Sequence, residues 1–137
     1  MFSQTFEYAL RAVVFLAERP NSRWTANQIA EAVQVPAGYL AKVMQILAKK
    51  EIVKSQRGLN GGFSLARNPD ELTVYEVLTI VDPLPRIRQC PLNIESHKVN
   101  LCALHRKLDT SMEMVEQSLR DTKISELFAG EPIFPQA

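Results

Sequence analysis

The residues best suited to metal or redox chemistry lie in one short stretch of the chain. Both cysteines, Cys90 and Cys102, and both histidines, His97 and His105, occur in the segment RQCPLNIESHKVNLCALHRKLD. Thiolate and imidazole groups are both ligands for transition metals. Two thiols in one loop can equally form a reversible disulfide. The segment is therefore predicted to be a metal site or a thiol switch.

The composition predicts one compact intracellular domain with a modest appendage. The chain has 137 residues, 46% of them hydrophobic, and a net charge of +1. No apolar run approaches the roughly 20 residues of a membrane span, and Glu7 and Arg11 interrupt the only candidate signal segment. We therefore expect a cytoplasmic protein without membrane attachment. Two cysteines in that compartment are more often thiols, ligands or redox sensors than a structural bridge.

The charges are distributed unevenly along the chain. Residues 1–67 hold nine Lys/Arg against four Asp/Glu, whereas residues 68–137 hold seven against eleven. The strongest basic bias runs over residues 42–67, where Glu51 is the one acidic residue. A basic first half suggests a polyanionic partner such as nucleic acid.

The first half has the pattern of a helix-turn-helix. Apolar residues recur at helical spacing over 4–18. Thr25 and Gln28 have capping-box spacing and predict the start of a second, short helix that ends near Val33. Pro36 fits the first position of a third helix. A tight turn between two helices, the second with a basic exposed side, is typical of a DNA-binding helix-turn-helix.

A hairpin is predicted directly after the third helix. Residues 53–57 and 63–66 alternate in polarity, and Asn60-Gly61 between them is a strong hairpin signal because both residues tolerate positive φ. A two-stranded hairpin in this position is a wing. The expected fold is therefore mostly α with a small β-hairpin: a winged helix-turn-helix domain followed by a long dimerisation helix.

The winged helix predicts a set of DNA contacts, because its second helix enters the major groove and its wing reaches the backbone or the minor groove. The expected contact residues are Tyr39, Lys42 and Gln45 on the helix, and Arg57, Gly58, Asn60 and Gly61 on the wing. Tyr39 could equally be a half-buried anchor between helices. The sequence contains no Walker loop, dinucleotide fingerprint or Ser-His-Asp set, so we do not expect an enzyme.

The second half adds a capped helix and a long apolar stripe. Thr73 and Glu76 form a second capping box, and Pro83 ends the helix that follows. The stripe consists of Leu101, Leu104, Leu108, Met112, Val115 and Leu119. It predicts a helix seam between two copies of the chain, or packing on the chain's own first helix for part of its length.

These patterns divide the chain into four parts. They are a winged helix-turn-helix DNA-binding domain over 1–82, a cysteine-containing sensor loop over 83–101, a dimerisation helix with a short C-terminal helix over 102–128, and a tail over 129–137 that we expect to fray.

The segment YLAKVMQILAKKEIVKSQRGLNGGFSLAR resembles the helix and wing of the Rrf-two family, the winged-helix transcription regulators of the IscR and NsrR type. FEYALRAVVFLA, LTVYEVLTIVD and CALH extend the resemblance across nearly the whole chain. The resemblance implies a homodimer, crossed by its long helix, that binds palindromic operators on double-stranded DNA. It also implies that the loop before the long helix can hold an iron–sulfur cluster.

Compared with three-cysteine members of the family, this chain lacks one thiol. Cys90 and Cys102 match the first and last of the three, whereas Ser96 or His97 fills the middle position. Glu7 matches a position where related regulators supply a carboxylate ligand. The resemblance thus implies a 2Fe–2S site formed by Cys90, Cys102, Glu7 and one histidine, either His105 or His97 as its substitute.

A second departure lies on the recognition helix. Gly38 and Ala41 stand where some members carry polar side chains that touch bases. The operator of this chain therefore cannot be taken from those members.

The main hypothesis is a homodimeric DNA-binding repressor whose operator affinity responds to an iron–sulfur cluster or to the redox state of the 86–105 loop. One alternative is a winged-helix regulator with a metal-free thiol switch or with no cofactor. Another is a protein–protein interaction module. Glu7 could simply form a surface ion pair with Arg11, four residues later on the same helix.

Overall fold

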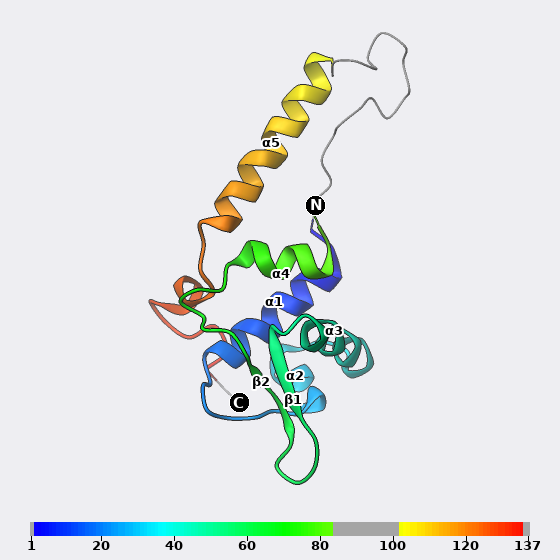
Figure 1. The fold of residues 1–137 in the computed structure, drawn as a ribbon, viewed down its shortest axis with the longest axis vertical. Coiled ribbons are helices and arrows are strands. Elements are labelled where there is room, and N and C mark those ends of the chain that lie inside the picture. Colours follow the sequence, from blue (N-terminus) through cyan, green and yellow to red (C-terminus); the bar gives the residue numbers. More distant parts are fainter. Residues whose placement is uncertain (1, 84–101, 136–137) are drawn as a thin grey trace.

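The structure, a computed structural model, describes residues 2–83 and 102–135. Its elements in chain order are α1 (Gln4–Ala17), α2 (Ala26–Val33), α3 (Ala37–Lys49), β1 (Val53–Gln56), β2 (Gly62–Leu65), α4 (Val74–Val81), α5 (Ala103–Arg120) and the 3-10 helix η2 (Ile124–Phe128). The chain is mostly helical with one two-stranded hairpin, as predicted (Figure 1). The predicted sensor loop, with Cys90 and His97, lies almost entirely outside the described residues.

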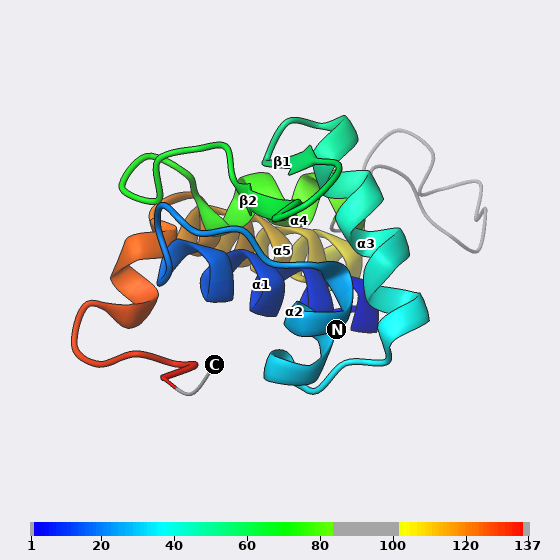
Figure 2. The ribbon, with the colours of Figure 1, turned by 90° about the horizontal axis from the view of Figure 1, so that it is seen from below.

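Helix α1 is the centre of the hydrophobic core. Eight of its residues are buried, including Phe6, Val13, Phe15 and Leu16. It packs against α2, α3, α4, β2 and η2, so that it has neighbours on nearly every side (Figure 2). A helix enclosed in this way needs apolar residues around most of its circumference, and the run AVVFLA supplies them.

The helix-turn-helix forms where the sequence places it. The capping box of α2 is present: Gln28 N–H donates to Thr25 Oγ1 at 3.1 Å, and Thr25 N–H donates to the Gln28 side chain at 2.9 Å. Gln34 ends α2 in the left-handed region at φ 60°. Pro36 lies one position before the place we predicted, because its ψ of 129° makes it the N-cap and α3 begins at Ala37.

The wing is an antiparallel pair in which Val53 faces Leu65 and Lys54 faces Ser64. The hairpin that Asn60-Gly61 predicts is confirmed, but of these two residues only Asn60 adopts positive φ. Residues 57–61 form a longer loop, and positive φ occurs at Gly58, Asn60 and Gly62 but not at Gly61. Gly61 is needed for a steric reason instead, since a Cβ there would lie 2.4 Å from the Gln56 carbonyl oxygen.

A short backbone pairing that the sequence did not predict fixes the wing to the core domain. Trp24 N–H donates to the Phe63 carbonyl at 2.9 Å, and Phe63 N–H donates to the Trp24 carbonyl at 2.7 Å. The Trp24 ring then packs edge-on against Phe15 of α1, with ring centroids 5.1 Å apart. Trp24 thus forms an isolated antiparallel bridge beside β2.

Helix α5 leaves the body of the molecule (Figure 1) and has no buried residue. Its C-terminal end is held to α4, because Arg120 donates a hydrogen bond to the Tyr75 hydroxyl at 2.9 Å and lies over the Tyr75 ring. The chain then returns to the core at η2, where Ile124 is fully buried and its N–H donates to the Leu72 carbonyl.

The described residues of the predicted tail contact the end of α1. The Glu18 carboxylate at the end of α1 accepts hydrogen bonds from the backbone N–H groups of Ile133 and Phe134. Arg19 donates to the Phe134 carbonyl, and the Phe134 ring lies against Phe15. No local sequence pattern signals these contacts, because Glu18 and Phe134 are far apart along the chain.

Glu76 carries the second capping box and also links α4 to the segment that follows the wing. Its carboxylate accepts from Thr73 N–H at 2.9 Å and from Arg67 at 3.1 Å. Partial burial raises the pKa of Glu76, but the hydrogen bonds from Thr73 and the hydrogen bond and charge of Arg67 outweigh it, so that the pKa lies below its ordinary value. The ionised form therefore stabilises the fold.

This lowered pKa predicts a pH-dependent contribution to stability. A carboxyl whose pKa is lower in the folded state stabilises the protein above its unfolded pKa, and the contribution is lost as the pH falls through the folded value. We expect the free energy of unfolding of wild type to fall more steeply between about pH 5 and pH 3 than that of Glu76→Gln. Chemical denaturation at several pH values measures the difference. Glu71→Gln, at a nearby exposed carboxylate, should follow wild type, and identical profiles for wild type and Glu76→Gln would contradict the assignment.

Candidate DNA-binding face and ligand residues

The outward face of α3 presents two of the predicted DNA contacts. Leu40, Val43, Met44 and Leu47 bury the inner face of α3. Lys42 and Gln45 are exposed on the other side. Helical periodicity therefore predicted correctly that these two side chains are exposed, since exposure depends only on which face of α3 is apolar. Their contact with DNA stays a prediction.

Tyr39 has a second environment that the sequence left open. Its side chain is 37% exposed, and its ring meets Tyr8 of α1 edge-on with centroids 5.2 Å apart. Its hydroxyl shares a hydrogen bond with the Thr5 hydroxyl. Tyr39 therefore joins the start of α3 to α1, as the anchor interpretation expects, while part of it still borders the exposed face.

The wing presents its loop to solvent. Arg57, Gly58 and Asn60 are exposed, and Gly61 is half-buried. The sequence analysis missed Leu59, whose side chain at the tip of the loop is 95% exposed. Its place inside the glycine-rich stretch RGLNGG was the signal that could have identified it, since no core lies within reach of a hairpin tip.

At the other end of the molecule, α5 begins with two of the predicted metal ligands. Cys102 is the N-cap of α5, and its Sγ lies 3.3 Å from His105 Nδ1. The two side chains therefore lie together, one helical turn apart. A thiol and an imidazole in this arrangement can bind the same metal centre.

The structure does not bring Glu7 into a metal-binding cluster with the described residues. Glu7 Oε1 lies 3.6 Å from Arg11 Nε, and the side chains of Glu7 and Arg11 are 55% and 37% exposed. Arg11 also donates to the Val33 carbonyl at 3.2 Å. Over residues 2–83 and 102–135, no three His, Cys, Asp or Glu side chains are grouped so that they could hold a metal ion. A complete ligand set would need residues from the 84–101 segment or from a second chain.

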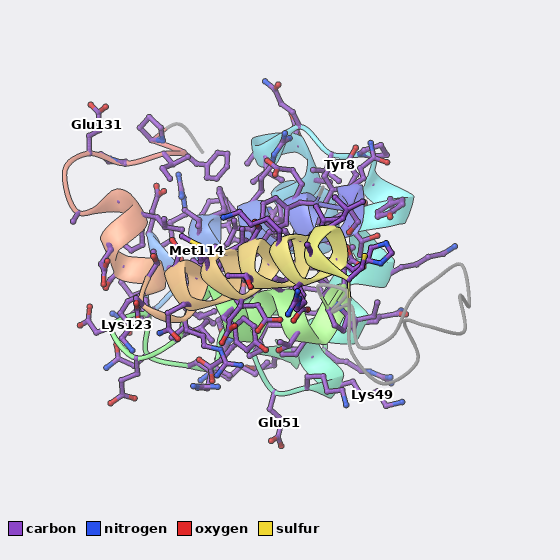
Figure 3. The ribbon with its side chains drawn as sticks, turned by 90° about the horizontal axis from the view of Figure 1, so that it is seen from above. Tyr8, Lys49, Glu51, Met114, Lys123 and Glu131 are labelled. Carbon is purple, nitrogen blue, oxygen red and sulfur yellow. The ribbon has the colours of Figure 1, made fainter. Side chains whose placement is uncertain are left out.

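The apolar stripe on α5 is uncovered over its first half. Leu104 is 64% exposed, Leu108 is 46% exposed and Met114, beside the stripe, is 69% exposed. Figure 3 views the molecule from the side of α5 and shows Met114 there. Leu119, at the other end, packs against the core. Within the described residues, the body of the chain therefore covers the stripe at Leu119 and leaves Leu104 and Leu108 exposed, and the main neighbour of α5 is α4 and not the first helix.

None of the helices in the described ranges is long and apolar enough to cross a membrane.

Comparison with known proteins identifies the family. The model of the Rrf2 family, described as "Iron-dependent Transcriptional regulator", matches residues 2–130. A protein of Aquifex aeolicus (strain VF5), named as an HTH-type transcriptional regulator, is 31% identical over 130 residues, which cover 93% of this chain and 90% of that protein. The chain therefore belongs to the Rrf2 family of transcriptional regulators.

Solved structures agree with the fold. CymR (YrzC), the global cysteine regulator of B. subtilis, is similar with a TM-score of 0.77 at 21% identity, over 93% of this chain and 95% of that one. IscR of T. potens is similar with a TM-score of 0.76 at 22% identity, over 93% and 85%. The family match identifies the protein as a DNA-binding transcriptional regulator with a winged helix-turn-helix, and not as an enzyme.

The contacts of Tyr39 predict a structural role that can be measured. Tyr39→Ala removes the edge contact with Tyr8 and the hydrogen bond to Thr5, so we expect the free energy of unfolding to fall by about 1–2 kcal/mol. Tyr39→Phe keeps the ring contact and should lose about half as much. Lys42→Ala, one turn further on the exposed face, should change stability by less than about 0.5 kcal/mol. Equal stabilities for Tyr39→Ala and Lys42→Ala in urea denaturation would overturn the anchor interpretation.

Proposed function

We propose that two copies of this chain dimerise through α5 and act as a repressor on a palindromic operator. The proposal rests on one observation: a possible ligand pair and an uncovered apolar surface lie on the same short stretch of α5. The Cys102–His105 pair and the uncovered leucines Leu104 and Leu108 all lie in the first turns of α5. A change at the ligand pair would therefore act directly on the surface that joins the two copies.

The dimer would hold DNA through paired elements. Lys42 and Gln45 of each α3 would face the major groove, with Tyr39 at the edge of that face. The wing residues that would approach the sugar–phosphate backbone or the minor groove are Arg57, Gly58, Asn60 and Gly61. Two recognition helices bind one palindrome only when they stand about one turn of DNA apart, so the geometry of the dimer sets the affinity.

The sensing site would be a 2Fe–2S cluster bound by Cys90, Cys102, His105 and Glu7, with His97 as a substitute for His105. The Cys102 thiol and the His105 imidazole fit such a cluster, because both are ligand types that iron accepts and they already lie side by side. When bound, a cluster would supply a redox-sensitive link between the 84–101 segment and the start of α5. Glu7 would have to release Arg11, or serve the cluster of the partner subunit.

The chain offers a path from this site to the DNA-binding face. Arg120 at the far end of α5 contacts Tyr75 of α4, and α4 packs against both α1 and α3. A tilt of α5 would therefore move α4 and, through it, the recognition helix. Because operator spacing is fixed, even a small change of this kind would alter affinity.

A metal-free thiol switch is the second candidate, and one observation favours it. The Glu7 carboxylate, which the cluster would need, lies beside Arg11 in an ion pair. Cys90 and Cys102 would then sense oxidants by forming a disulfide, or the chain would regulate with no cofactor. In each case we place the protein in the cytoplasm, where its operator DNA is.

The dimer predicts a clear change in mass. Leu104→Glu/Leu108→Glu would bury carboxylates in the proposed seam, and we expect a monomer by light scattering with unchanged helix content by circular dichroism. Arg106→Glu/Thr110→Glu places the same charges on the opposite side of α5 and should leave a dimer. A dimer that persists in the leucine variant would show that the seam lies elsewhere.

A bound 2Fe–2S cluster would give the purified protein a visible colour and an iron content. Full-length protein purified without oxygen should absorb in the visible range and contain iron and acid-labile sulfide in equal amounts. Cys102→Ala should lose most of the iron, whereas Ser111→Ala, further along the same helix, should retain it.

Two other outcomes separate the alternatives. If the protein contains no iron, its DNA affinity changes with oxidant, and Cys90→Ser or Cys102→Ser abolishes this change, then the sensor is the thiol switch and not the cluster. Iron-free protein whose affinity is the same in those variants as in wild type would remove sensing at this site altogether.

A further inference from the structure

The strand-like segment before α2 creates a row of polar side chains across the wing. Lys54 faces Ser64 in the β1–β2 register, and the bridge between Trp24 and Phe63 is antiparallel. Continuing that register places Arg23 opposite Ser64. Residues opposite each other in antiparallel strands point to the same face, so Lys54, Ser64 and Arg23 form one row. Their neighbours Val53, Phe63 and Trp24 turn to the core side.

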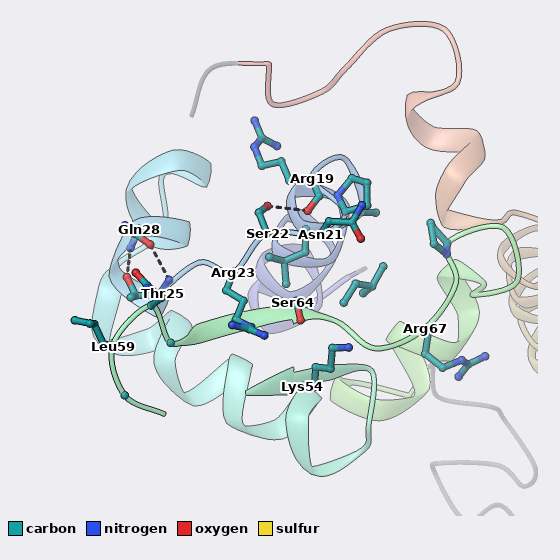
Figure 4. Close-up of a pocket in the computed structure, with 18 residues that line it drawn as sticks. Arg19, Asn21, Ser22, Arg23, Thr25, Gln28, Lys54, Leu59, Ser64 and Arg67 are labelled. Atoms are coloured by element: carbon teal, nitrogen blue, oxygen red, sulfur yellow. Dashed lines mark hydrogen bonds between the residues drawn. The ribbon is translucent and has the colours of Figure 1, made fainter. Parts of the chain in front are cut away.

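This row lies in an open groove with a volume of about 850 Å³ beside the wing (Figure 4). The turn between α1 and α2 forms one part of the groove, and the hairpin with its loop forms the other. Its basic lining residues are Arg19, Arg23, Lys54 and Arg67. No Asp or Glu is among the lining residues, so the groove is suited to an anion.

The basic residues of the groove differ in how they are engaged. Arg67 is paired with Glu76 at 3.1 Å. Arg19 donates to the Phe15 carbonyl and lies 4.0 Å from the centre of the Phe15 ring. Arg23 and Lys54 are exposed, and neither contacts a carboxylate within 4.0 Å in the part of the chain that the structure describes. These two charges are therefore available to an external partner.

We propose that Arg23, Lys54 and Ser64 bind the phosphate backbone of the DNA beside the wing, as a second set of contacts in addition to those of α3 and the wing loop. Arginine, lysine and serine are among the residues that most often contact DNA phosphates. The inference rests on the proposed mode of DNA binding and adds to it a named set of backbone contacts.

The shape of the groove favours a strand of DNA over a free phosphate ion. The groove is open to solvent, and its lining continues without interruption into the wing loop at Gly58, Leu59, Asn60 and Gly61. A backbone that leaves the wing tip would pass directly over the row. The two backbone hydrogen bonds between Trp24 and Phe63 hold Arg23 beside the hairpin, and Gly62 permits this approach, since a Cβ there would lie 2.7 Å from the Trp24 carbonyl group.

Salt dependence tests the surface without knowledge of the operator, because phosphate contacts are independent of sequence. The probe is a fluorescein-labelled random-sequence duplex of about 30 base pairs, titrated with the full chain at several salt concentrations. Arg23→Ala/Lys54→Ala should lower the affinity about tenfold or more at low salt. It should also reduce the slope of log K against log salt by about 1 for each phosphate that the variant no longer neutralises.

The matched control is Arg106→Ala/Lys107→Ala, which removes the same two residue types from the exposed surface of α5. It has the same net charge as the test variant and should retain the wild-type slope. An equal weakening of binding in both double variants would show a general charge effect and overturn the proposal. Arg57→Ala, on the wing loop, measures the proposed function independently.

The remaining outcomes separate the two proposals. If Arg57→Ala weakens binding and Arg23→Ala/Lys54→Ala does not, the second surface is wrong while the wing contact stands. If wild type binds no duplex at low salt, the DNA-binding mode itself fails. The last experiment is calorimetry with sodium phosphate at constant ionic strength. If phosphate binds saturably, and Arg23→Ala/Lys54→Ala abolishes this binding but leaves the duplex affinity unchanged, the groove binds free phosphate and the proposed DNA contact is wrong.

Discussion

Helix α1 must be buried on nearly all sides, and this constraint organises the DNA-binding half of the molecule. Its apolar run is too wide for a single partner to cover, so α2, α3, α4, β2 and η2 all pack around it. Each of these elements packs its apolar face on α1 or on its neighbours there, and its outward face is mostly polar, although Ile46 of α3 is 39% exposed. The exposed positions of Lys42 and Gln45 are a direct consequence, because α3 has one orientation that buries Leu40, Val43 and Leu47.

The wing depends on the same core through a different interaction. Two strands alone are marginally stable in water. Here the backbone of Trp24 bridges to Phe63 of β2, and the Trp24 ring packs against Phe15. The hairpin is therefore positioned relative to α2 and α3 and not only by its own loop. This attachment is what turns the side of the wing into a basic groove continuous with the wing loop.

Helix α5, unlike α1, has no buried residue. It is joined to the body chiefly at its C-terminal end, where Arg120 donates a hydrogen bond to Tyr75. Its N-terminal turns carry both the uncovered leucines and the Cys102–His105 pair. A helix held at one end and uncovered at the other can respond to a second chain or to a ligand with little cost to the core. In the proposed regulator, the sensing residues at the start of α5 are therefore separate from the hydrophobic core that stabilises the fold.

The features that could be predicted from the amino-acid order alone are local ones. The capping boxes at Thr25 and Thr73, the apolar periods of α1, α3 and α5, and the closeness of Cys102 to His105 depend on residues a few positions apart, and their physics is complete within one turn of helix. Contacts between residues far apart in the sequence depend on the tertiary structure. Examples are the backbone pairing of Trp24 with Phe63, the hydrogen bonds from the Phe134 backbone to Glu18, and the contacts of Tyr39 with α1. No local pattern encodes such contacts, because each arises only when the burial of α1 brings its neighbours together.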